Sequence, residues 1–123
     1  MNPSEFEKIA WRAIESLPAE FKPYVEGCML LIEPQPKPEL LLELDIAEDE
    51  GLYGLYEGAA LTDRSRDDPP DLPPRVTLFY EPLIEDFGDN EQDLIHEIQV
   101  TVLHEIGHHF GLDEDRLEEL GFA

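Results

Sequence analysis

Apolar residues recur at two spacings along the chain, and each spacing predicts a different kind of element. Close to the first residue they recur every three or four positions and predict a packing helix, which Ser4 and Glu7 open as a capping box and Pro18 ends. Two short strands are expected next, at residues 28–33 and 39–46, separated by the proline-rich spacer PQPKP. The apolar positions of the first helix are Phe6, Ile9, Ala10, Ala13 and Leu17.

The middle of the chain contains a glycine-rich stretch, a proline-rich stretch and one alternating segment. Residues 51–61, GLYGLYEGAAL, predict extended backbone that turns or lies close against another element. Residues 62–74 hold four prolines and no apolar periodicity, which predicts an exposed loop, either a plain connection or a lid over a site. The segment RVTLFYEPL then predicts a strand at residues 75–80 that Pro82 ends.

The longest helical pattern, EQDLIHEIQVTVLHEIGHHF, begins after a cap at Asp89 or Asn90 and is closed by Gly111. A short last helix, capped by Asp113, is expected to end near Gly121. These elements predict an α+β fold in a single domain over residues 1–123, a length that supports one core and not two. The positions of the long helix expected to face the core are Ile95, Val102, Leu103, Ile106 and Phe110.

The charge of the chain is strongly unbalanced. Thirty Asp and Glu residues stand against eight Lys and Arg residues, which gives a net charge of −22. The hydrophobic fraction of 41% is that of an ordinary globular protein, so the imbalance does not indicate disorder. A surface of this sign repels phosphate backbones and anionic membranes and attracts cations and basic peptides, so neither nucleic acid nor membrane is an expected partner.

Targeting signals and disulfides are not indicated. The first residues, MNPSEFEKIAWR, lack the apolar core of a signal peptide, and no apolar run reaches the roughly 20 residues of a membrane span. A cytoplasmic location is therefore expected. The single cysteine, Cys28, has no partner for an internal disulfide and lies in the apolar run CMLLIE, where a buried structural thiol is expected.

The stretch HEIGHHFGLDE carries the candidate chemistry. At about 100° per residue, His104 and His108 lie about 40° apart on one face of the long helix, so both imidazoles can reach a common centre. The apolar positions fall on the other side and anchor the helix. This arrangement predicts two ligands of a metal ion.

Glu105 is the candidate catalytic residue. It lies about 100° around the helix from His104, beside the histidine pair, where a carboxylate reaches a metal-activated water and not the metal itself. Such a carboxylate takes a proton as water attacks a carbonyl and passes it to the leaving amine. The pattern therefore predicts zinc-dependent hydrolysis of a peptide bond.

A catalytic zinc needs a third protein ligand, because three ligands and one open position are usual. In peptidases of the HExxHxxGxx(H/D) pattern this ligand comes six residues after the second histidine, which selects Glu114 here. Asp113 is an alternative, although its place before a helical run suits a cap, and Asp115 is another. We therefore expect one Zn²⁺ bound by His104, His108 and Glu114.

With HEIGHHFGLDEDRLEELG, GLYEG and RVTLFYEP, the chain resembles the small bacterial zincin-like metallopeptidases over nearly its whole length. The resemblance implies a zincin-like fold in which a small mixed sheet packs against an N-terminal helix and a long active-site helix. It also implies a zinc site at His104 and His108 and Glu105 as catalytic acid and base. The family commonly has Asp where this chain has Glu114, and no methionine follows the helix to make a Met-turn.

The resemblance further implies that an edge strand above the active-site helix pairs with extended substrate. Residues 75–80 are the candidate for that strand, and Tyr56 in GLYEG is a candidate donor to a developing oxyanion. The expected partner is accordingly a peptide or an unfolded protein segment. Two other functions compete: a metal-binding or protein-binding module without turnover, and a metal-dependent nuclease, which the surplus of acidic residues disfavours.

Overall fold

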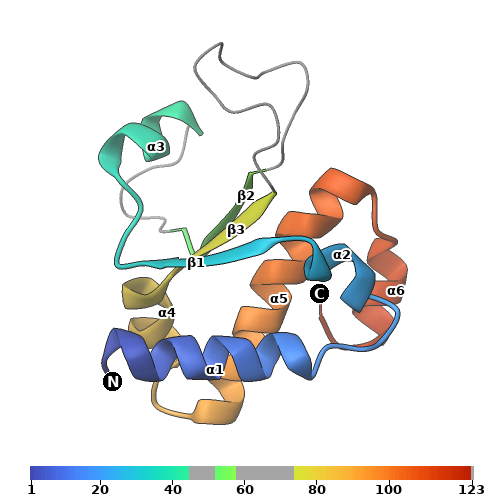
Figure 1. Cartoon of the computed structure of the whole chain (residues 1–123), viewed down its shortest axis with the longest axis horizontal. Helices are drawn as coiled ribbons and strands as arrows, with labels where there is room; N and C mark the ends of the chain where they lie inside the picture. The colour runs from blue at the N-terminus through green and yellow to red at the C-terminus, as the bar shows by residue number, and fades with distance from the viewer. Residues whose placement is uncertain (45–51, 58–73, 123) are drawn as a thin grey trace.

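The computed structural model describes residues 1–44, 52–57 and 74–122, apart from the side chains of His108 and His109. In these residues the chain forms six helices and three strands (Figure 1). None of the described helices is long and apolar enough to cross a membrane. The elements are α1 (Pro3–Glu15), α2 (Lys22–Glu26), β1 (Met29–Glu33), α3 (Pro38–Glu43), β2 (Gly54–Glu57), β3 (Arg75–Phe79), α4 (Tyr80–Phe87), α5 (Glu91–Phe110) and α6 (Glu114–Glu119).

The sheet is mixed and has the strand order β1-β3-β2. β1 runs parallel to β3, with Leu31 opposite Thr77, and β2 runs antiparallel to it, with Tyr56 opposite Val76. Four of the five residues of β3 are buried, as expected for a strand with neighbours on both edges. The prediction that residues 75–80 form an edge strand is therefore wrong, because β3 is the central strand and β2 is the edge strand beside it.

Two expectations for the first half of the chain are also wrong. Residues 39–43 of the strand expected at 39–46 lie in the helix α3, in which Pro38 occupies the first turn and needs no intrahelical N–H partner; residues 45 and 46 lie outside the described residues. The cap of α1 is Asn2, whose Oδ1 accepts a hydrogen bond from the Glu5 N–H at 2.8 Å, and not the expected pair of Ser4 and Glu7. The loop expected at residues 62–74 lies almost wholly outside the described residues.

The core lies where α5 meets α1 and the sheet. Figure 1 shows α5 running between the strands on one side and α6 on the other, with α1 crossing its lower half. The buried Gln99 of α5 links this helix to the end of α1. Its Nε2 donates to the Ala13 carbonyl at 2.9 Å and lies 3.0 Å from the Ser16 hydroxyl. Phe110 was expected to face this core but is 47% exposed. The fully buried side chains of α5 are Leu94, Ile98, Val102, Leu103 and Ile106.

Candidate metal site

Local hydrogen bonds set both ends of α5. Asn90 caps the first turn, since its Oδ1 accepts from the N–H groups of Gln92 at 2.8 Å and Asp93 at 3.3 Å. At the other end Gly111 has a left-handed backbone (φ 66°), and the N–H of Leu112 bonds the Gly107 carbonyl at 3.2 Å. This hydrogen bond closes a six-residue turn that ends the helix and reverses the chain. Glycine allows the turn because it adopts the left-handed backbone without steric cost. The expected start and end of the helix are confirmed.

His104 lies on the exposed face of α5, away from the buried stripe. By helix periodicity the backbone of His108 follows on the same face one turn later, about 40° around the axis. Glu105 is half-buried at the border between this face and the core. The relative placement that the sequence predicted for His104 and Glu105 is therefore present along the helix.

One nitrogen of His104 is occupied by a backbone group. Its Nε2 lies 3.0 Å from the carbonyl oxygen of Phe122. Because a carbonyl oxygen only accepts, Nε2 carries the proton in this hydrogen bond. In the neutral ring Nδ1 then keeps its lone pair and is the nitrogen available to a metal ion, while the carbonyl holds the orientation of the imidazole.

The segment that supplies this carbonyl is firmly held. Gly121 has a φ of 86°, and the N–H of Phe122 donates to the Leu117 carbonyl at 2.8 Å. The Phe122 side chain is 8% exposed and packs in a cluster with Leu17, Phe21, Leu103 and Leu117, and its ring stacks on His96 with centroids 5.9 Å apart. Nothing in the local sequence around Phe122 indicates that this segment returns to α5.

Strand β2 contacts α5 on the side of the His104 face opposite the Phe122 segment. Gly54 lies so close to α5 that a Cβ there would be 2.6 Å from Cγ2 of Thr101, which is three residues before His104. Farther along β2, the ring of Tyr56 lies with its centroid 6.0 Å from that of Phe110. β2 therefore passes α5 between residues 101 and 110, the interval that contains Glu105 and His108.

Tyr56 has the surroundings of a packing residue. It is half-buried against the main core cluster, and burial, followed by the charge of Cys28, raises the pKa of its phenol. The hydroxyl therefore stays protonated at neutral pH and keeps its capacity to donate. Its role as an oxyanion donor remains a prediction.

The expectation of a buried thiol at Cys28 is wrong, because Cys28 is only half-buried. Its thiol lies 3.4 Å from the Tyr24 carbonyl.

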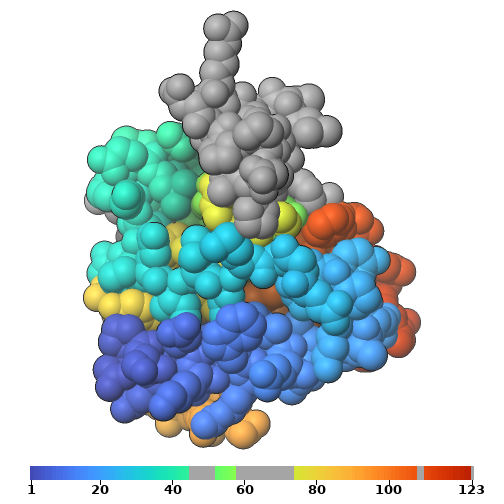
Figure 2. All heavy atoms as spheres, viewed as in Figure 1, coloured from blue at the N-terminus to red at the C-terminus, as the bar shows by residue number. Residues whose placement is uncertain are grey.

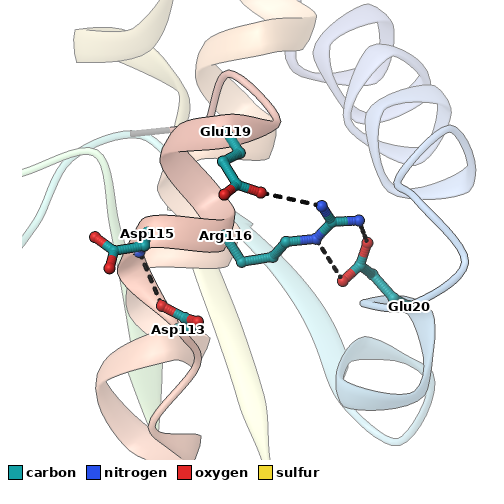
Figure 3. Close-up of polar contacts among 5 residues, drawn as sticks. All are labelled: Glu20, Asp113, Asp115, Arg116 and Glu119. Carbon is teal, nitrogen blue, oxygen red and sulfur yellow. Dashed lines mark hydrogen bonds and ion pairs between the residues drawn. The ribbon is translucent and has the colours of Figure 1, made fainter.

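Asp113 performs the capping role expected of it. Its Oδ1 accepts a hydrogen bond from the Asp115 N–H at 3.0 Å, so α6 begins at the next residue, Glu114 (Figure 3). Arg116 ties the helix down, because two of its nitrogens contact the Glu20 carboxylate at 2.9 and 3.2 Å and a third contacts Glu119. Figure 3 shows the Arg116 side chain extended between these two carboxylates, with Asp115 pointing away from them.

The expected ligand set is described only in part. Glu114 and Asp115 are exposed in the first turn of α6, directly after the reversal at Gly111. Among the side chains that the structure describes, which exclude that of His108, no three His, Cys, Asp or Glu groups lie close enough to hold a metal ion. The donor types nevertheless suit zinc, which binds imidazole nitrogen and carboxylate oxygen, and His104 presents an exposed ring held in one orientation.

Comparison with known proteins agrees with the fold. No curated protein matches the chain. Among solved structures, a conserved hypothetical protein from T. thermophilus is 26% identical, superposes with a TM-score of 0.59, and is matched over 97% of this chain and 96% of that chain. The α+β architecture expected from the sequence is confirmed. The family model described as zincin-like metallopeptidase matches residues 25–122, so the chain belongs to the zincin-like metallopeptidase family.

Proposed function

We propose that this protein is a zinc-dependent peptidase that hydrolyses exposed peptide or unfolded protein segments. The observation that carries the proposal is that α5 holds His104 against the Phe122 carbonyl, while β2 contacts the same helix at Thr101 and Phe110, on either side of Glu105 in the sequence. One flank supplies a strand edge for an extended chain, and the other holds a histidine ring in a fixed orientation. Family membership supports the same reaction.

In this proposal His104, His108 and Glu114 hold the zinc ion. The ion, when bound, polarises the substrate carbonyl and lowers the pKa of its water to about 7. Glu105 then acts as the general base that removes the proton from the attacking water. The same carboxyl group delivers that proton to the nitrogen of the departing amine, which leaves Glu105 ionised for the next cycle.

Substrate pairing is proposed for β2 in place of residues 75–80. Among the described strands β2 pairs with β3 on one edge only, and its Gly54 lies against Thr101 of α5. An extended peptide that adds to this edge would form main-chain hydrogen bonds that make little demand on its side chains. Its backbone would lie above the turn of α5 that carries Glu105.

Hydrolysis of an unstructured protein by the wild type and by Glu105→Gln tests the proposal. The amide cannot remove a proton from water, so the rate is expected to fall at least about 100-fold while zinc stays bound. Glu97→Gln is the matched control, because it removes the same charge two turns earlier on α5. A chelator should abolish cleavage by the wild type, and full activity of Glu105→Gln with zinc bound would contradict the assigned mechanism.

The alternative is a metal-binding or protein-binding module without turnover. Glu114 favours this function, because the family commonly has Asp at this position and the longer side chain changes the reach of the third ligand. The two functions differ in a simple observation. The module binds zinc without cleaving any unstructured protein, whereas chelator-sensitive cleavage that depends on Glu105 is the property of the peptidase alone.

A further inference from the structure

A small apolar crevice opens where β1 begins, on the opposite edge of the sheet from β2. Its floor includes the core residues Val76 and Val102, and its volume is about 20 Å³, room for little more than a methyl group. Two large side chains at its border remain exposed: Trp11 of α1 at 44% and Met29 of β1 at 46%. The other lining residues are Ile14, Val25, Cys28 and Leu30.

The backbone of β1 continues this surface. Within the described residues the other edge of β1 has no partner strand. The Met29 N–H donates to the Pro74 carbonyl, on the β3 side, at 2.9 Å. Because backbone groups alternate in direction along a strand, the amides of Leu30 and Ile32 point away from β3. Figure 2 shows the cyan atoms of this strand at the surface, directly above the blue atoms of α1.

The charges near the β1 edge and the crevice determine which net charge a binding partner must carry. Three of the five elements that line the crevice end on an exposed glutamate, namely Glu15 of α1, Glu26 of α2 and Glu33 of β1. The whole chain carries a net charge of −22. A second copy would bring the same charge to the contact and be repelled, whereas a cationic segment would be attracted.

We propose that the β1 edge and the crevice bind an extended cationic peptide segment. Its backbone pairs with Leu30 and Ile32, and the tip of one aliphatic side chain enters between Trp11 and Met29. This surface is separate from the proposed peptide edge on β2. It also includes α1, which precedes the part of the chain that matches the family. The segment binds here whether or not the protein hydrolyses peptides.

Trp11 provides the test, since it is the one tryptophan of the chain and lines the crevice. The full chain with Glu105→Gln, which prevents cleavage of the probe, is titrated with a peptide of alternating Lys and Leu while Trp11 fluorescence is recorded. The emission is expected to shift and saturate. Peptides of alternating Glu and Leu, and of alternating Lys and Ser, are expected to give no saturable shift.

Two charge-changing variants locate the site. Met29→Lys is expected to weaken binding about tenfold, and Leu42→Lys, at an 80% exposed apolar position on α3, by no more than about twofold. Amide chemical-shift changes at Leu30 and Ile32 in the parent give a readout that does not depend on the folding of either variant. Equal weakening by both variants, binding of the acidic peptide, an emission change due to self-association, or shift changes confined to β2 would overturn the proposal.

Discussion

The carbonyl oxygen of Phe122 lies 3.0 Å from Nε2 of His104, eighteen residues away in sequence. This contact joins the last described segment to the helix that carries the family motif. It fixes which ring nitrogen of His104 holds the proton and leaves the lone pair on Nδ1. A metal ion that binds Nδ1 keeps the contact, whereas one that binds Nε2 must break it.

The metal-free protein is therefore expected to hold His104 as the Nε2–H tautomer. Phe122→Ala should release the carbonyl and allow both tautomers, and should lower the free energy of unfolding by about 3 kcal/mol because a buried ring is lost. Long-range nitrogen–proton NMR spectra of the ring report the tautomer. Phe122→Leu, which keeps an apolar side chain in the cluster, should retain Nε2–H. A dominant Nδ1–H form in the parent would contradict this account.

Gly54→Ala is expected to destabilise the protein by about 1–3 kcal/mol, because the new methyl group would lie 2.6 Å from Cγ2 of Thr101 and 3.2 Å from the Thr77 carbonyl oxygen. Thr101→Ser removes that Cγ2 and should recover part of the loss. Urea unfolding of the parent, the two single variants and the double variant gives the coupling energy. Strict additivity of the two changes would mean that β2 and α5 are not in contact at this point.

Asp113→Asn separates capping from metal binding. Asparagine caps a helix about as well as aspartate, so the stability of the protein should change little, whereas Asp113→Ala should cost about 1 kcal/mol. If Asp113 is a cap and not a ligand, the asparagine variant should bind zinc as the parent does. A large loss of zinc affinity at unchanged stability would assign the third ligand to Asp113.

Ionisation of Tyr53 is expected to lower the free energy of unfolding at high pH. Its hydrogen bond to Asp86, then burial and the negative charges of Asp86 and Glu97, raise the pKa of its phenol to about 12. Since the folded pKa exceeds the unfolded value of about 10, the stabilisation is complete below pH 10 and is lost as the pH rises towards 12. Tyr53→Phe should show a smaller decline than the parent, measured by denaturant unfolding across that range, because the raised pKa of Tyr56 still contributes. Tyr24→Phe, as the control, should decline as the parent does.

The sequence predicted well those elements whose ends carry local signals. Asn90 and Gly111 bound α5, Asp113 caps α6, and α6 ends close to Gly121 as expected. The expected strand is wrong at residues 39–43, because a short Leu-rich run suits a strand or a helix equally well, and Pro38, a signal for a helix start, also belongs to the proline-rich spacer. Local composition does not decide such segments.

Local sequence patterns do not predict the contacts between segments that are far apart along the chain. That β3 is central and β2 an edge depends on pairing between strands separated by more than 15 residues, and the alternation of residues 75–79 is the same in either position. The contact of His104 with the Phe122 carbonyl could not be predicted from the sequence, because every residue has a backbone carbonyl. Exposed Phe110 shows a related limit, since it continues the apolar stripe of α5 past the end of the core.

Zinc binding to protein purified without a histidine tag tests the central claim most directly. We expect one zinc ion per chain, with affinity at least about tenfold weaker in Glu114→Ala, which loses a ligand. Glu118→Ala, an equally exposed change in the same helix, should bind as the parent does. Absence of stoichiometric zinc in the parent, or equal affinity in all three proteins, would contradict a site formed by His104, His108 and Glu114.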